Sequence, residues 1–154
     1  MSSFNSANLV FLVTFAFPFG LVWRILGLLM DTSAYAFSSS DILRIFGQNV
    51  LQTLNKKKYA YIAEIEFWSL SNYDKDIKNR SKRLYDKLLN LFEKVVAKGI
   101  KQGEFKELDI RRTAMIILAV FQGVNWFAVF NESSVSPKAY IEDSIELIIK
   151  SISK

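Results

Sequence analysis

The chain has 154 residues and a net charge of +5, and 51% of its residues are hydrophobic, which suits one domain with a sizeable core. It contains no cysteine and no histidine, which excludes disulfides, thiolate metal sites and the Ser-His or Cys-His pairs of nucleophilic enzymes. Nucleotide and phosphate-binding glycine motifs are also missing, so we expect no enzyme, no cofactor and no metal site.

The N-terminal segment, residues 1–36, is strongly apolar and has three possible interpretations. Residues 9–30 are long enough to span a bilayer as a helix. Arg24 interrupts this stretch, Pro18 and Gly20 break its middle, and no Lys or Arg precedes it as in a signal peptide. The alternatives are a buried or misplaced segment, a membrane anchor, and a signal peptide with a cleavage site near residues 34–36.

Two helices are predicted next, over residues 41–55 and 59–70. Ser40 or Asp41 can cap the first of them. The second is apolar on most sides, which is typical of a helix in the middle of a bundle. It also contains Glu64 and Glu66, which are two residues apart and therefore point in different directions. A hydrolase built on paired carboxylates thus has no supporting site there.

Three further helices are predicted over residues 73–98, 110–130 and 137–154. Ser71 and Asn72 precede the first, and Gly99 and Gly103 close it. Lys and Arg alternate with Asp and Glu along its first half, so its positive charge indicates a solvated face and not a nucleic-acid track. Strict alternation typical of strands is missing. The sequence therefore predicts an all-α, antiparallel helical bundle over residues 37–154.

The order of motifs in this region resembles that of a known family. Glu-Phe-Trp at residues 66–68 precedes the long helix, and Gly-Ile-Lys-Gln-Gly-Glu-Phe at residues 99–105 follows it. Asp109 then caps an apolar helix that contains Ala114 and Gly123. In this order and spacing, the chain from residue 64 onward resembles the C-terminal domain of TetR-family transcriptional regulators, and more loosely from about residue 41.

The resemblance implies a homodimer in which the last two helices pack against their copies as a four-helix bundle. The implied interface residues are Ala119, Gly123, Phe127, Ile141, Ile145 and Ile148. Gly123 would let a neighbouring helix approach closely. The alternative is that Gly123 and the apolar helix around it serve only the core of the monomer.

The resemblance also implies a pocket inside the bundle for an apolar or amphipathic small molecule. The candidate ligand-binding residues are Tyr61, Phe67, Trp68, Tyr85, Phe92, Phe121, Gln122, Asn125 and Trp126. Gln122 and Asn125 are the most informative, because buried amides need partners that a ligand or a neighbouring subunit could supply. For each aromatic residue, plain core packing is the alternative.

The resemblance does not extend to the DNA-reading domain of that family. A helix-turn-helix needs several phosphate contacts, and Arg24 is the only lysine or arginine before Ser40. We therefore expect a cytoplasmic effector-binding and dimerisation module without its own DNA-binding domain. DNA would be a partner only if an upstream domain is missing from this chain, through truncation or as a natural sensor fragment. The alternative is a membrane-anchored helical interaction protein held by residues 9–30.

Overall fold

The computed structural model describes residues 37–130 and 134–154, and this part of the chain contains helices and no β-strand. The helices are α3 (Ser39–Lys56), α4 (Lys58–Leu70), α5 (Lys75–Lys101), α6 (Ile110–Gln122), α7 (Asn125–Val129) and α8 (Pro137–Ile152). The predicted all-α class is confirmed. The apolar segment of residues 1–36, with its possible span at 9–30, lies outside the described residues.

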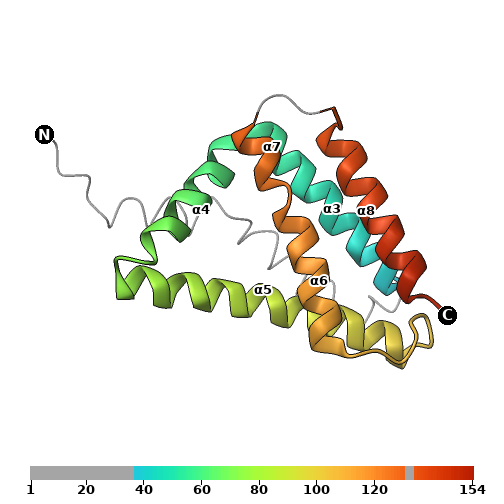
Figure 1. Ribbon diagram of the computed structural model, residues 1–154. Helices are drawn as coiled ribbons and strands as arrows, with labels where there is room; N and C mark the ends of the chain where they lie inside the picture. The colour runs from blue at the N-terminus through green and yellow to red at the C-terminus, as the bar shows by residue number, and fades with distance from the viewer. Residues whose placement is uncertain (1–36, 131–133) are drawn as a thin grey trace, which may run out of the picture.

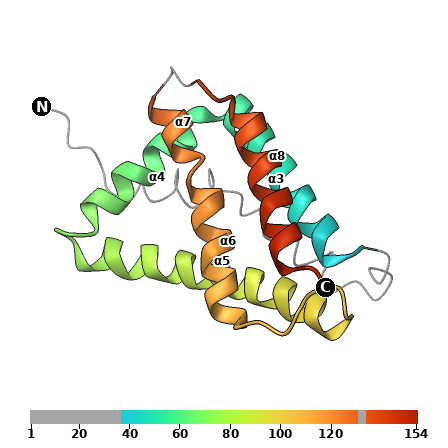
Figure 2. The same cartoon turned by 45° about the vertical axis from the view of Figure 1, so that its right-hand side comes forward.

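The helices form a bundle with a triangular outline (Figures 1 and 2). The long helix α5 forms one side, α4 the second, and α3 and α8 lie side by side and antiparallel along the third. Helix α6 crosses α5 and leads up to α7, which packs against α4. Helices α6 and α7 therefore lie inside the triangle, where α6 contacts α5 and α8 and α7 contacts α4.

Local capping explains where most helices begin. Asp109 accepts a hydrogen bond from the Arg112 amide at 2.9 Å at the start of α6, as predicted, and Ser136 caps α8 ahead of its first-turn proline. Two predicted caps were wrong by a few residues. Helix α3 is capped by Ser38 in a capping box with Asp41, and α5 is capped by Asp74.

One long helix was predicted over residues 110–130, but the structure divides it into α6 and α7. At the break, the amides of Trp126 and Phe127 bond the carbonyls three residues earlier, at Gly123 and Val124, which is a tighter turn than in an α-helix. The sequence hides this break because the apolar pattern continues through it. The short helix α7 is thereby turned toward α4.

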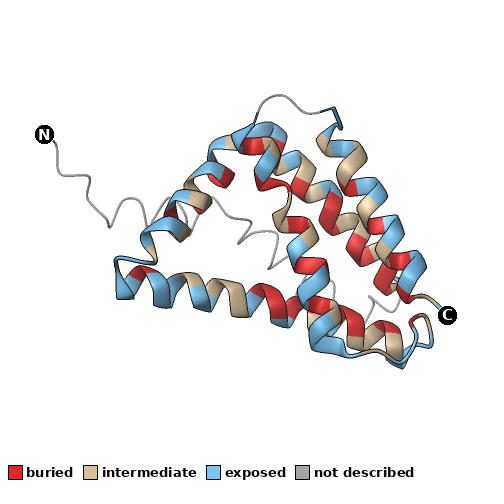
Figure 3. Ribbon diagram, in the orientation of Figure 1, coloured by how far each residue is buried: buried red, intermediate tan, exposed pale blue. Residues whose placement is uncertain are grey.

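Three aromatic rings hold the centre of the core. Phe46 packs edge-on against Phe92 and Phe121, with ring centroids 5.0 and 4.5 Å apart, and Phe92 stacks on Phe121 at 5.5 Å. Figure 3 shows the buried residues on the inward faces of the helices. Gly47 lets α8 approach α3, since a Cβ there would lie 2.3 Å from the Ile145 side chain.

The end of α5 is folded back by the motif at residues 99–105. Gly103 has a φ of +74°, which a side chain would disfavour, and the amides of Glu104 and Phe105 both bond the Gly99 carbonyl. This turn places the Phe105 ring directly on Gly99, with no exposed surface. Gly103 therefore allows the left-handed turn, and Gly99 allows the close contact with the Phe105 ring.

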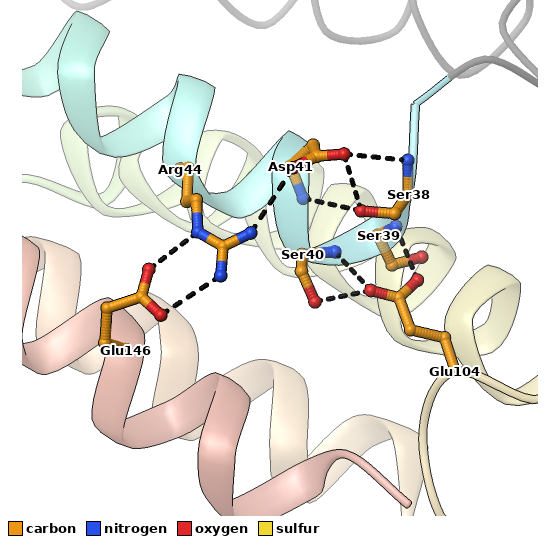
Figure 4. Close-up of polar contacts among 7 residues, drawn as sticks. All are labelled: Ser38, Ser39, Ser40, Asp41, Arg44, Glu104 and Glu146. Atoms are coloured by element: carbon orange, nitrogen blue, oxygen red, sulfur yellow. Dashed lines mark hydrogen bonds and ion pairs between the residues drawn. The ribbon is translucent and has the colours of Figure 1, made fainter.

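The same turn aims Glu104 at the start of α3 (Figure 4). Its carboxylate accepts hydrogen bonds from the backbone amides of Ser39 at 2.7 Å and Ser40 at 2.9 Å, and from the Ser40 hydroxyl. The first amides of a helix lack internal partners and favour negative charge, so a distant carboxylate completes the cap. Arg44, one turn further along α3, forms a paired contact with Glu146 of α8 at 2.6 and 3.0 Å.

Among the described residues, the stretch Ile110–Val129 is long and apolar enough to cross a membrane, with a mean hydropathy of 1.4. In the structure this stretch forms α6 and α7 at the centre of the bundle, where Ala114, Ile117 and Leu118 are buried. A core helix of a globular domain meets the same criteria of length and composition.

Candidate ligand-binding site

A small cavity lies inside the bundle at the level where α7 packs on α4. Its volume is about 20 Å³, and a single water molecule needs roughly 10–15 Å³ of such space. It is lined by Phe46 and Val50 of α3, Tyr61 and Glu64 of α4, Leu88 of α5, Leu118, Phe121 and Gln122 of α6, and Asn125 of α7. Helices that are distant in the sequence thus contribute to one largely apolar site.

Glu64 is the unusual residue in this lining. Helix α4 buries Ala60, Tyr61, Glu64 and Phe67, which recur at helical spacing, so the acid occupies a core position of its helix. Its side chain is only 1% exposed. The Asn125 amide donates a hydrogen bond to the carboxyl group, but the atom Oε2 has no partner in the described structure.

Burial governs the protonation of Glu64. Removing a carboxylate from water penalises its charged form, and this raises the pKa of Glu64 from 4.5 to about 8, while the Asn125 hydrogen bond opposes the rise. The carboxyl group is therefore mainly protonated at neutral pH. Burial likewise raises the pKa of Tyr61, and the nearby Glu64 adds to this effect.

Asn125 and Tyr61 complete the polar part of the site. Asn125 is 7% exposed, and its Oδ1 atom has no hydrogen-bond partner in the described structure. The Tyr61 hydroxyl donates to the Val50 carbonyl at 3.1 Å, which directs its proton away from Glu64. The cavity therefore presents two buried oxygen atoms that lack hydrogen-bond partners in the described structure, surrounded by apolar side chains.

The structure brings four of the predicted ligand-binding residues together at this cavity: Tyr61, Phe121, Gln122 and Asn125. Phe92 lies behind the lining, stacked on Phe121. The half-buried Tyr85 packs against the outside of the core, and Trp68 is half-buried away from the lining.

Two other predicted ligand-binding residues lie away from this cavity. Phe67 is buried with Ile77 in a separate apolar cluster between α4 and α5. Trp126 is 68% exposed and stacks on Phe130, with ring centroids 5.8 Å apart. Consecutive residues of a helix point roughly 100° apart, so the inward position of Asn125 directs its neighbour Trp126 away from the cavity.

Sequence reasoning also missed residues that line the cavity, above all Glu64. The signal was present, because Glu64 lies three residues after Tyr61 and three before Phe67 on the buried stripe of α4. Its spacing from the exposed Glu66 does not indicate this burial, whereas its spacing from the apolar residues on its own face does. Phe46, Val50, Leu88 and Leu118 are also in the lining, and nothing in the sequence distinguishes them from other core residues.

Four of the predicted dimer-interface residues pack within the chain itself. Ile141 and Ile145 are buried in the chain's own core, against Gly47 of α3, and not on its outer surface. Gly123 is approached by Tyr140 of α8, since a Cβ there would lie 2.1 Å from the Tyr140 hydroxyl. Phe127 packs on the same tyrosine, with ring centroids 5.3 Å apart. These contacts serve packing within one chain.

The other two predicted interface residues, Ala119 and Ile148, belong to an outer apolar face of α6 and α8. Met115, Ile116 and Ala119 are exposed and share one face of α6 by their spacing. Leu147 of α8 is 68% exposed, with the half-buried Ile148 beside it. The Tyr140 hydroxyl donates to the Val120 carbonyl at 2.9 Å and holds the two helices together.

Comparisons with known proteins agree with this architecture. Residues 41–148 match the family model described as BetI-type transcriptional repressor, C-terminal. No curated protein and no solved structure matches the chain significantly. The family match covers α4, α5, α6 and α7 and most of α3 and α8, and so includes every residue that lines the cavity. The chain therefore belongs to the family of BetI-type transcriptional repressor C-terminal domains, the regulatory domains of TetR-type repressors.

Proposed function

We propose that this domain senses a small amphipathic molecule, which binds between α4 and α7 at the cavity around Glu64 and Asn125. The observation that carries the proposal is the pair of buried oxygen atoms, Glu64 Oε2 and Asn125 Oδ1, which line one cavity and lack partners in the described structure. Leaving a buried polar atom unpaired costs about 1–3 kcal/mol, so such atoms in a regulatory domain favour a ligand that pairs with them.

The size of the cavity indicates how binding couples to the fold. A space of about 20 Å³ takes the polar head of a ligand but not its apolar body. Binding a whole molecule therefore requires α7 to move relative to α4 and α6. The tight turn at Gly123 and Val124 is the natural hinge, because it is already separated from the regular helix. Such a movement would connect the ligand to the outer face of α6.

We expect thermal-shift screening of the full-length chain to identify small molecules with an apolar body and one polar head that stabilise it. A ligand present at 100 times its Kd adds roughly 2.7 kcal/mol to the free energy of unfolding. Asn125→Leu should abolish the stabilisation, because it removes an acceptor of the site. Asn90→Leu is the matched control, since Asn90 is exposed on α5. A screen without any stabilising molecule, or equal loss in both variants, would contradict the proposal.

We further propose that two copies of the chain associate through the outer apolar face of α6 and α8, in the cytoplasm. Met115, Ile116 and Leu147 would otherwise leave large apolar side chains in water on adjoining helices. A second copy presents the same surface, so a twofold arrangement would bury both. In a regulator of this kind the dimer, and not an enzymatic reaction, transmits the signal.

Leu147→Glu is expected to convert a dimer into a monomer, because it places charges at the centre of an apolar contact. Sedimentation equilibrium at micromolar concentration measures the change as a halving of the mass. Leu70→Glu introduces the same charge at an exposed position at the end of α4, outside this face, and should leave the dimer intact. A wild-type chain that stays monomeric at high concentration would show that the face has another role.

A further inference from the structure

We propose that Glu64 is a pH-sensitive switch: when it loses its proton, α7 is released from α4 and the cavity opens to water. The inference concerns the cavity described above, but it needs no ligand, so it can hold or fail independently of the proposed function. Three features carry it: the surroundings of Glu64, the weak attachment of α7, and the difference in proton affinity between the closed and open forms.

The closed cavity suits a neutral Glu64 and not a carboxylate. Among the described residues, α3, α5 and α6 contribute only apolar side chains and Gln122 to the lining, and α7 contributes Asn125. The titratable groups of the lining are Glu64 and Tyr61, both of α4, and the Tyr61 hydroxyl is directed to the Val50 carbonyl. A carboxylate can accept about four hydrogen bonds, and the Asn125 amide donates one. An ionised Glu64 would therefore lack both a counter-ion and most of its donors.

Helix α7 is the part of the lining that can move most easily. It has five residues, and a helix shorter than about 12 residues is marginal in water unless it packs against other elements. Its inner face consists of the buried Asn125 and Ala128, whereas Trp126 is 68% exposed. The tight turn at Gly123 separates it from α6. Movement of α7 about this turn would bring water to Glu64 and leave the longer helices in place.

The closed and open forms bind the Glu64 proton with different affinities. Burial raises the pKa of Glu64 to about 8 in the closed form, whereas its ordinary value, 4.5, applies in water. Between these two values the open form binds fewer protons than the closed form, so a rise in pH favours the open form. The ratio of open to closed molecules should increase close to tenfold for each pH unit from about pH 5 to about pH 8, and level off above.

The switch connects a buried acid to the surface of the bundle. Helix α7 carries Asn125 on its inner side, and on its outer side Trp126 stacks on Phe130, with ring centroids 5.8 Å apart. Release of α7 would therefore change the outer surface as well as the cavity, and the domain would respond to alkaline pH. Under the proposed function the same movement admits a ligand, so alkaline pH and ligand binding would act in the same direction.

The test is hydrogen exchange of the backbone amides in the full-length chain between about pH 5.5 and pH 8, with each rate corrected for intrinsic exchange at that pH. In the wild type, the hydrogen-bonded amides of Phe127 and Phe130 should lose protection close to tenfold for each pH unit. In Glu64→Gln, which cannot ionise, their protection should not depend on pH. Glu66→Gln removes an exposed acid from the same helix and should keep the wild-type slope.

Core amides of α5, such as that of the buried Leu89, report global unfolding in the same experiment. They should stay better protected than the α7 amides at every pH, because the switch releases α7 alone. Tyr61→Phe removes the other titratable group of the lining and should keep the wild-type slope. Equal protection of α5 and α7, or a slope that persists in Glu64→Gln, would overturn the inference. No ligand is used, so a failed thermal-shift screen would leave the switch standing and contradict only the proposed function.

Discussion

Glu64→Gln is expected to stabilise the folded chain at pH 8 and to have little effect near pH 4.5. The pKa of Glu64 is raised from 4.5 to about 8 by burial, so the folded state keeps its proton over a range in which the unfolded state has lost it. The unfolded state then binds fewer protons than the folded state, and stability falls as the pH rises from 4.5 to 8. Glutamine cannot ionise and avoids this loss.

The size of the effect follows from the same pKa. A rise from 4.5 to about 8 corresponds to roughly 4 kcal/mol at pH 8 and roughly 5 kcal/mol well above it. Urea unfolding of the wild type and the variant at several pH values between 5 and 9 measures the difference directly. Because other ionisable groups are common to both proteins, their contributions cancel in the comparison. Glu66→Gln removes an exposed charge and should show no such trend.

A difference between the wild type and Glu64→Gln that stays constant with pH would show that Glu64 ionises normally. The cavity would then be hydrated, and the argument for a protonated carboxyl group in the free domain would fail. The result bears on function as well, since a group that costs the fold several kcal/mol when ionised needs a compensating role. Replacing it by a neutral residue of the same shape removes the cost and the proposed ligand contact together.

Phe105→Ala is expected to destabilise the chain by about 4 kcal/mol, a value typical of a fully buried phenylalanine. Phe105 is 0% exposed and its ring covers Gly99, whose missing side chain provides the space. The residue also connects two ends of the fold, because Phe105 pairs with Ser153 and the next amide, of Lys106, bonds the Ile152 carbonyl at 2.8 Å. Loss of the ring leaves a cavity that these contacts prevent from closing.

Thermal or urea unfolding measures this loss, and Tyr73→Ala is the control. Tyr73 is 88% exposed in the turn between α4 and α5, so removal of its ring should change the stability by no more than about 0.5 kcal/mol. Similar losses in the two variants would mean that the turn at residues 99–105 is not anchored by its aromatic side chain.

Features that depend on neighbouring residues were predicted well. The helix starts at Asp109 and Ser136 follow from side chains that bond amides three residues away. The stop after α5 follows from Gly103, whose left-handed conformation glycine adopts without strain. The family resemblance rests on the same local motifs in their order, and the match over residues 41–148 confirms it.

The partners of each buried helix face were predicted poorly. The spacing of Ile141 and Ile145 shows that one face of α8 is buried, but it does not show whether α3 or a second chain covers that face. Gly123 indicates a close approach, and the approaching group is Tyr140 of the same chain. In both cases a helical stripe specifies burial without specifying the partner.

The sequence by itself determined the class of fold, the helices apart from the break between α6 and α7, the caps of α6 and α8, and the family, because periodicity, capping and turn chemistry act over a few residues. Only the tertiary structure decided that Glu64 and Asn125 meet in one cavity and that Glu104 caps α3 across 64 or 65 residues of chain. The physical reason is that the surroundings of a buried side chain come from other helices. Those surroundings decide whether the pKa of an acid is raised and whether an oxygen atom finds a hydrogen-bond partner. That environment arises when the helices pack.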